Sequence, residues 1–172
     1  GGATGAAGAA INVDKIGGTT RAYIDSAVFI NDTVTGNAAQ STDVMAANHA
    51  MIASSASALA IGAAGVSGAV GTEVVERSTR AEVIDGARIF AKGAASVNAV
   101  STNSVAQISA GAAGGALAGL AGSGDVVLLK GSTVALVDRA TVSADSISVV
   151  ADGTNSANLI AGSIAGGGAV GA

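Results

Sequence analysis

Three aspartates recur at similar places in this chain, and they are the first candidates for chemistry. Carboxylates gathered on one edge of a protein can bind Ca²⁺ or act as an acid and base pair. Asp25, Asp85 and Asp138 are spaced by 85 − 25 = 60 and 138 − 85 = 53 residues. With several turns of chain between them, we expect a separation of roughly 14 Å. We therefore interpret them as corner residues, since an Asp side chain can hydrogen-bond its own backbone two residues on.

The other reactive side chains stand alone. His49 is the only histidine, its nearest carboxylate in sequence is Asp43, and the chain has no cysteine. These facts argue against a zinc site and favour an exposed position for His49. Ser54 and Ser55 do not belong to a Gly-x-Ser-x-Gly elbow.

Two glycine motifs are incomplete. Gly122-Ser-Gly-Asp125 resembles a fragment of the Ca²⁺-binding nonapeptide, but the full repeat is absent. Lys130-Gly-Ser-Thr133 has the order of a phosphate-binding loop reversed. We therefore expect no enzyme activity, no catalytic residues, no bound metal and no cofactor.

Internal repetition organises the whole chain. The pair Gly5-x-x-Gly8 returns as Gly65-x-x-Gly68 and Gly119-x-x-Gly122, and Thr102-Asn-Ser104 returns as Thr154-Asn-Ser156, at an interval of 154 − 102 = 52. Such a fixed long period is typical of solenoids and arrays. We expect one segment over residues 1–172, an excerpt of a longer array, with repeats at about 5–64, 65–118 and 119–172.

Composition supports a narrow stacked core. The chain has 26 Gly, no Pro and only 2% aromatic residues, and much of its 49% hydrophobic content is alanine. A round core would lack bulky groups, whereas stacked rungs contact only their neighbours. Proline removes a donor from a sheet ladder, so its absence favours strands. Glycine within the alanine tracts weighs against an all-helical fold, although 44–51 would suit a short helix.

The expected fold is an all-β, right-handed parallel β-helix. A period of 52–60 residues divides into about three coils of roughly 18–20 residues, which gives about nine coils in a rod on the order of 40 Å long. Ala22, Ile24, Ala27 and Phe29 are expected to face inward. Their counterparts in the third repeat are Ala135, Val137, Ala140 and Val142. The extra residue of the second repeat predicts a bulge near Val83 and Ile84.

The charge and hydrophobicity of the chain limit the classes of partner that it could bind. The net charge is −4 and no basic patch with interleaved aromatics is present, which argues against nucleic acid. The Gly/Ala tracts run for about a dozen residues, short of the ~20 needed by a spanning helix. Charges of both signs, Glu73 and Glu82 among them, cluster in the strand-and-corner third of each period, where we expect a solvated face. Asn and Ser are expected to stack in ladders at the recurring corners, and the small residues of the tracts would narrow the coil or admit a neighbouring copy.

The sequence also resembles a known family. A run of Gly-Ala-x, an Ile/Val strand and then Gly17-Gly-Thr-Thr-Arg-Ala-Tyr-Ile-Asp-Ser-Ala-Val28 with its Asn/Ser-rich continuation resembles the repeats of large bacterial filamentous adhesins. These are haemagglutinin-like exoproteins that include the leukotoxin-like filamentous adhesin family. The resemblance spans the whole chain and implies an exported rod at the cell surface, with no catalytic residues to carry over.

These observations leave three functions open. The first is the structural shaft of an extracellular fibre or adhesin, associating with copies of itself end to end or laterally and reaching a host or neighbouring cell. The second is a repetitive face that binds glycan or ice. The third, a polysaccharide-degrading β-helix enzyme, is disfavoured because carbohydrate clefts need aromatic platforms and a carboxylate pair.

Overall fold

The computed structural model describes residues 4–26, 28–31, 40–168 and 170–171, and its regular structure is entirely β-strand. The four long strands are β1 (Ala6–Ile24), β3 (Thr42–Ile84), β5 (Ala94–Asp138) and β7 (Ser146–Gly167). The four short ones are β2 (Phe29–Ile30), β4 (Arg88–Phe90), β6 (Thr141–Ser143) and β8 (Val170–Gly171). The all-β prediction is confirmed, and the helix considered for 44–51 is replaced by strand.

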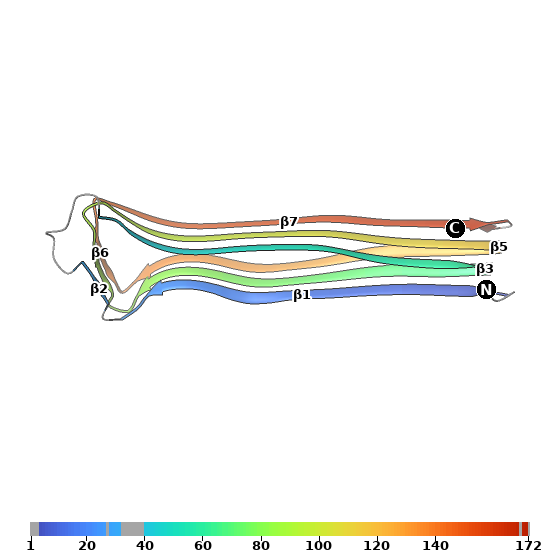
Figure 1. Cartoon of the computed structure of the whole chain (residues 1–172), viewed down its shortest axis with the longest axis horizontal. Coiled ribbons are helices and arrows are strands. Elements are labelled where there is room, and N and C mark those ends of the chain that lie inside the picture. The colour runs from blue at the N-terminus through green and yellow to red at the C-terminus, as the bar shows by residue number, and fades with distance from the viewer. Residues whose placement is uncertain (1–3, 27, 32–39, 169, 172) are drawn as a thin grey trace.

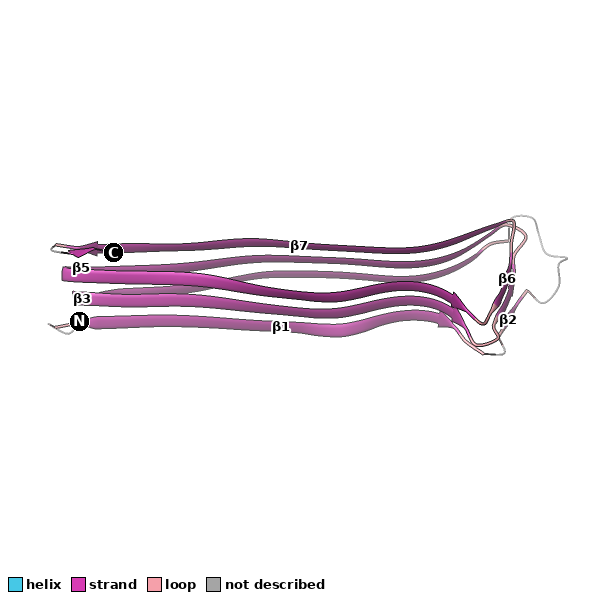
Figure 2. Cartoon of the chain, turned by 180° about the vertical axis from the view of Figure 1, so that it is seen from behind, coloured by secondary structure: helices cyan, strands magenta, loops and turns pink. Residues whose placement is uncertain are grey.

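Every strand pair is parallel. The long strands pair in the order β1-β3-β5-β7, β8 adds to β5, and the short strands form a second sheet in the order β2-β4-β6. In Figure 1, β3 and β5 each run the length of the molecule, turn back and return. The short strands cross the opposite end, and the reverse view in Figure 2 shows the same arrangement.

The register links successive repeats directly. Ala6 pairs with Gly65 and Ala94 pairs with Ser146, so each strand residue lies beside its counterpart one full period along the chain. The expectation that a residue 18–20 positions later lies alongside is therefore wrong, and so is the division of each period into three coils. One period makes a single long circuit, because its strands run the length of the molecule in each direction (Figure 1).

The shape differs accordingly from the short rod of nine coils that the sequence predicted. The long axis of the molecule follows the strands (Figure 1). At about 3.3 Å per residue, a passage of about 20 residues spans roughly 65 Å, whereas neighbouring repeats are only about 4.8 Å apart. The segment is thus long in the direction of its strands and thin in the direction in which the repeats stack.

The extra residue of the second repeat lies at a corner. Pairing continues without interruption from Ala64 to Ile84, so the predicted bulge near Val83 and Ile84 is wrong. The one register shift lies between Gly62 and Ala64, where β3 turns back. At the other end, Ile84 pairs with Asp138 and Arg88 pairs with Thr141, so the interval between partners becomes shorter by one across this corner. The corner of the second repeat, which contains Gly86, therefore has one residue more than the corner of the third repeat.

Burial alternates along the long strands, as a two-sided sheet requires. Even-numbered residues are buried in the first half of β3, odd-numbered ones in its second half, and the inner sides of the two halves face each other. The apolar core near the short strands consists of eight buried side chains. They are Val44, Ala46, Ala81, Val83, Ala87, Ile89, Val97 and Ala99.

Most inward predictions agree with this core. Ala22, Ile24 and the four predicted residues of the third repeat pack against it. Phe29 does not, because it is 52% exposed and Ile30 takes the inward place, while Arg88 lies over the Phe29 ring at 5.5 Å. Ala27 lies outside the described residues. A second core joins Ile52, Val75 and Val105 in the middle of the strands.

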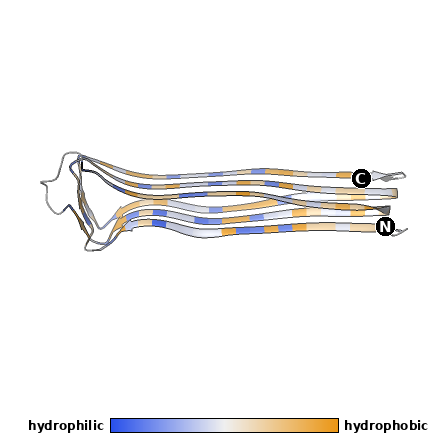
Figure 3. Ribbon diagram, viewed as in Figure 1, coloured by the Kyte–Doolittle hydropathy of each residue, from blue (hydrophilic) through white to orange (hydrophobic). Residues whose placement is uncertain are grey.

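Small residues bring the two sides together at the turn-back end. A Cβ on Gly111 would stand 2.6 Å from the Gly122 carbonyl oxygen, and one on Gly8 would stand 2.6 Å from that of Leu59. Figure 3 shows this end pale to orange, with the hydrophilic bands toward the middle and the short strands. The Gly/Ala tracts therefore narrow the molecule here, which is one of the two roles considered for them.

Candidate binding surface

The recurring aspartates lie much closer together than predicted. The Asp85 amide donates to the Asp138 carbonyl oxygen at 3.2 Å, so these corners belong to adjacent repeats. Arg139 joins them, with its guanidinium on Asp85 and its Nε 3.6 Å from an Asp138 carboxylate oxygen. The corner role predicted for the aspartates is consistent with this geometry. The wide separation expected between them is wrong, because it assumed three coils per period.

Each corner also has its own backbone signature. Asp85 and Arg139 occupy equivalent places and have φ values of 54° and 49°, in the left-handed region that most side chains avoid. Gly86 follows with φ 88°. In the first repeat the Ser26 amide donates to the Asp25 carboxylate at 2.6 Å, one residue on instead of the predicted two.

A row of three charges crosses the outer face of β1, β3 and β5. Glu76 lies 3.2 Å from the Lys15 ammonium and 3.6 Å from that of Lys130. The hydrogen bond and charge of Lys15, reinforced by Lys130, hold the pKa of Glu76 below its usual value. The two lysine side chains are largely exposed and that of Glu76 is about two-fifths exposed, so the row is a solvated feature, as the sequence predicted.

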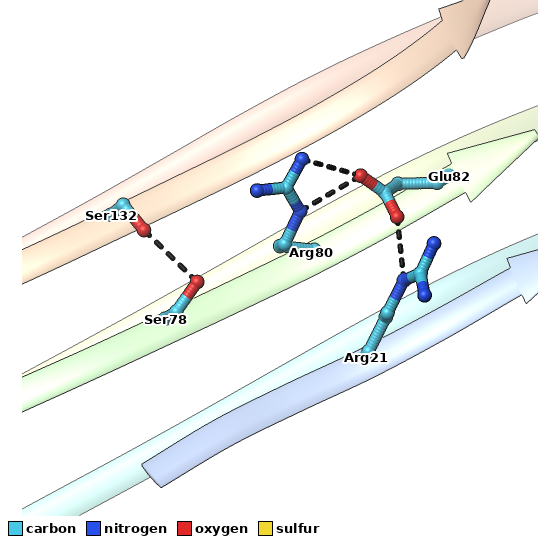
Figure 4. A network of polar contacts seen from close by, with 5 residues as sticks. All are labelled: Arg21, Ser78, Arg80, Glu82 and Ser132. Carbon is cyan, nitrogen blue, oxygen red and sulfur yellow. Dashed lines mark hydrogen bonds and ion pairs between the residues drawn. The ribbon is translucent and has the colours of Figure 1, made fainter. Parts of the chain in front are cut away.

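Closer to the corner, a second group surrounds a carboxylate that is nearly enclosed (Figure 4). The Glu82 side chain is 4% exposed and accepts hydrogen bonds from Arg21 Nε at 2.6 Å and Arg80 Nε at 2.8 Å. Burial alone would raise the pKa of Glu82, but the hydrogen bonds and charges of Arg80 and Arg21 outweigh it and lower the pKa. Arg21 also lies 4.4 Å from the centre of the Tyr23 ring.

Between these two groups the surface is hollowed. A depression of about 520 Å³ lies here, and residues of the neighbouring strands β1, β3 and β5 line it. Its lining residues are Gly17, Gly18, Thr19, Glu76, Arg77, Ser78, Lys130, Gly131 and Ser132. Ser132 donates to Ser78 at 3.0 Å across neighbouring strands (Figure 4). Lys130 and Ser132 of the reversed phosphate-loop pattern thus line an open surface instead of a loop.

The interior holds a separate acidic group, which was expected on the solvated face. Glu73 is 0% exposed, pairs in register with Asp14 and accepts a hydrogen bond from Ser54 on the opposite side. Burial raises the pKa of Glu73, Ser54 opposes this, and the nearby carboxylates of Asp14 and Asp125 raise it further. Its Oε2 has no hydrogen-bond partner among the described residues. The prediction of a solvated charge is therefore wrong for Glu73 and for Glu82.

Amide and hydroxyl side chains form the predicted ladders, but on the strands instead of at corners. Asn103 is 3% exposed and donates to Asn155 at 2.8 Å, its partner in the register. Ser109 of β5 donates to Asp125, the aspartate of the incomplete nonapeptide. Gln107 is 1% exposed and has no partner for either side-chain polar atom within the described chain.

His49 lies on an exposed position of β3, opposite Thr102. Within the ranges that the structure covers, no three His, Asp or Glu side chains are arranged to hold a metal ion. Those ranges also contain no helix long and apolar enough to span a membrane.

The fold and surface define a parallel β protein of stacked repeats, with a charged outer face and an interior that carries carboxylates and amides. The chain matches no family model, no curated protein and no solved structure.

Proposed function

We propose that the chain is a right-handed β-solenoid segment that serves as a structural part of an extracellular bacterial fibre or filamentous adhesin, at or beyond the cell surface. The observation that carries the proposal is the register. Each repeat pairs with the next along almost its entire length, and some columns repeat the residue type, such as Thr20, Thr79 and Thr133. Right-handedness follows from the strong preference of parallel β connections.

Two further features support a structural role for the chain. The core is thin and distributed along the strands, so each repeat is stabilised mainly by its neighbours, as in other repeat proteins. Parallel pairing can also continue without limit, because each repeat presents to the next a surface similar to the one it receives. Stiffness and regular growth are the properties that a fibre requires.

Tandem arrays of one, two and three copies test the architecture. Small-angle scattering should show one dimension growing with copy number, while the dimension along the strands stays constant. A compact particle whose dimensions all grow together would contradict the solenoid. Antibodies against the purified chain should label intact producing cells, and labelling only after permeabilisation would contradict the extracellular location.

A binding role is the second candidate, and the hollowed outer face favours it. Four cations and two carboxylates gather on this face, a net charge of 4 − 2 = +2, although the whole chain carries −4. They are Lys15, Arg21, Arg80 and Lys130, with Glu76 and Glu82. An acidic glycan suits such a surface, and a glycan array would show it. Lys15→Ala with Lys130→Ala should abolish the signal, whereas Lys92→Ala should leave it unchanged.

A further inference from the structure

An enclosed polar cluster lies between the two sides of the molecule, around the middle repeat. Its centre is Glu73, which is 0% exposed, and Gln107 and Ser109 belong to it at 1% exposure each. The second apolar core closes the cluster toward the short strands. The buried side chains of Ala56 and Ala69 close it toward the turn-back end. Because repeats lie on both sides of it along the stack, the cluster is internal.

Three carboxylates from three repeats meet in this cluster. Glu73 pairs in register with Asp14 of the first repeat, and the charges of Asp14 and of Asp125 from the third repeat both raise the pKa of Glu73. Asn12 donates to Asp14 at 3.0 Å. Within the described chain, no ion pair with a cationic side chain reaches any of the three carboxylates. Such a group is costly to bury unless protons or a cation neutralise it.

Serines on the opposite side fix two of these carboxylates. Ser54 donates to Glu73 Oε1, and Ser109 donates to Asp125 Oδ1. The second oxygen of each group, Glu73 Oε2 and Asp125 Oδ2, is buried and has no hydrogen-bond partner among the described residues. Each carboxylate is therefore held through one oxygen, while its other oxygen is available to a ligand.

The neutral amide of Gln107 is independent evidence for a ligand. Neither its oxygen nor its nitrogen has a partner in the described part of the chain. A Cβ on Gly71 would lie 1.5 Å from Gln107 Nε2 and 3.1 Å from Asp125 Oδ1, so the amide ends beside the Asp125 carboxylate. Rotation of the amide group exchanges its oxygen and nitrogen in the same space. Because buried amides are ordinarily partnered, this one is available to coordinate an ion.

We propose that the cluster binds one Ca²⁺ ion through Glu73, Asp125 and Gln107. The donors are oxygen atoms only, and Ca²⁺ accepts irregular sets of carboxylate and amide oxygens. Mg²⁺ demands near-ideal octahedral geometry and keeps several waters, which a cluster with so little exposure disfavours. Asp14 contributes charge and not a ligand, because no three acidic or histidine side chains of the described residues are arranged to hold a metal ion.

The ion would join neighbouring repeats from inside. Glu73 and Gln107 belong to the second repeat and Asp125 to the third, and the charge of Asp14 comes from the first. The site departs from the expected absence of a metal, because the register and the folding back of the strands bring together ligands that are far apart in sequence. Calcium would thus strengthen the contact between repeats, a role that goes beyond that of a passive shaft.

Equilibrium dialysis of the chelator-treated chain against CaCl₂ tests the site. We expect one ion per chain with a dissociation constant on the order of 10⁻⁴ M, toward the weak end for Ca²⁺ sites, because the protein supplies only three ligands. Calcium at about 100 times this constant should raise Tm by about 5–10 °C. Mg²⁺ at the same concentration should raise it several-fold less. The absence of binding, or an equal effect of Mg²⁺, would overturn the proposal.

Two substitutions distinguish a calcium ligand from a side chain that only supports the fold. Glu73→Gln should stabilise the metal-free chain at neutral pH and yet weaken calcium binding by more than about tenfold. Gln107→Met keeps the length of the side chain, removes the amide oxygen and should also weaken binding. Glu76→Gln on the outer face is the matched control and should bind calcium like the unaltered chain.

Each variant also has an outcome that contradicts the site. Calcium binding that survives Glu73→Gln would overturn the proposal, and so would binding that is lost in Glu76→Gln, since the ion would then lie on the outer face. If circular dichroism shows that Gln107→Met does not fold, Glu73→Gln decides the question alone. Failure of calcium binding would leave the register of the repeats, and with it the structural role, unchanged.

Discussion

Arg21 and Glu82 lie on neighbouring repeats, 61 positions apart, and are joined by a hydrogen bond of 2.6 Å. Glu82 points to the outer side of the sheet, yet its side chain is only 4% exposed. Arg21 and Arg80 cover it with their own side chains, which remain about two-fifths exposed. This contact therefore ties two repeats together at the surface, close to the corner.

Replacing Glu82 should destabilise the fold. Glu82→Gln leaves two guanidinium groups without their shared carboxylate, and we expect the free energy of unfolding to fall by about 2 kcal/mol, less than the roughly 3–5 kcal/mol of a fully buried pair. Urea titration followed by circular dichroism measures the change. Glu76→Gln on the same face is the matched control and should have a much smaller effect, since Glu76 is exposed.

The contact between Arg21 and Glu82 also predicts that the stability of the fold depends on pH. Because the pKa of Glu82 is lowered on folding, its contribution to stability is complete above the ordinary glutamate value. That contribution is lost as the pH falls through the lowered pKa. Stability of the unaltered chain should therefore drop in this acidic range more steeply than that of Glu82→Gln, and equal slopes would contradict the assignment.

Glu73 should behave in the opposite way. Its pKa is raised on folding, so its contribution to stability is present below the ordinary glutamate value and is lost as the pH rises through the raised pKa. We expect Glu73→Gln to stabilise the chain at neutral pH, because the amide avoids the cost of burying this carboxyl beside Asp14 and Asp125, which is the cost that raises its pKa. The gain should shrink toward zero in acid. A loss of stability at neutral pH would show that the carboxylate is needed there.

The close approach at the turn-back end predicts a contrast between two glycines that face each other. Gly111→Ala places a methyl group 2.6 Å from the Gly122 carbonyl oxygen and should cost about 1–3 kcal/mol. Gly122→Ala meets nothing within 4 Å and should change stability by less than about 0.5 kcal/mol. Thermal unfolding of the two variants provides the comparison, and equal effects would refute the close approach.

The corner at Gly86 predicts a purely conformational effect. A Cβ at Gly86 meets nothing within 4 Å, but its φ of 88° is a conformation that side chains disfavour. Gly86→Ala should therefore cost about 1–2 kcal/mol. Gly68→Ala, which has equal space and lies within a strand, should cost less. Chemical denaturation distinguishes the two, and a neutral Gly86→Ala would contradict the left-handed corner.

The sequence predicted strand, parallel stacking and its period correctly. Thr102-Asn-Ser104 lies directly opposite Thr154-Asn-Ser156, so the repeat length read from the sequence is the register itself. The number of turns in a period was not predictable in the same way. The turn near Gly62 is made of Gly and Ala alone, and the same residues also build the adjoining strands, so no residue type marks it.

The buried carboxylates were missed for a different reason. A charged residue in a strand is ordinarily assigned to the solvent side, and Glu82 does lie on that side but is covered by two arginines. Glu73 alternates in phase with the apolar Val75, a signal that was present in the sequence. That signal was outweighed by the surrounding cluster of charges, which suggested a solvated face.

The route of the chain through each repeat also determines how the segment would respond to tension. β1 begins and β7 ends at the same end of the molecule (Figure 1), so a pull applied there loads the outermost strand from its tip. Peeling one circuit of about 53 residues would release about 190 Å of extended chain, although that circuit adds only about 4.8 Å to the stacked height. Each repeat thus stores extended length, which a fibre under tension would release one strand at a time.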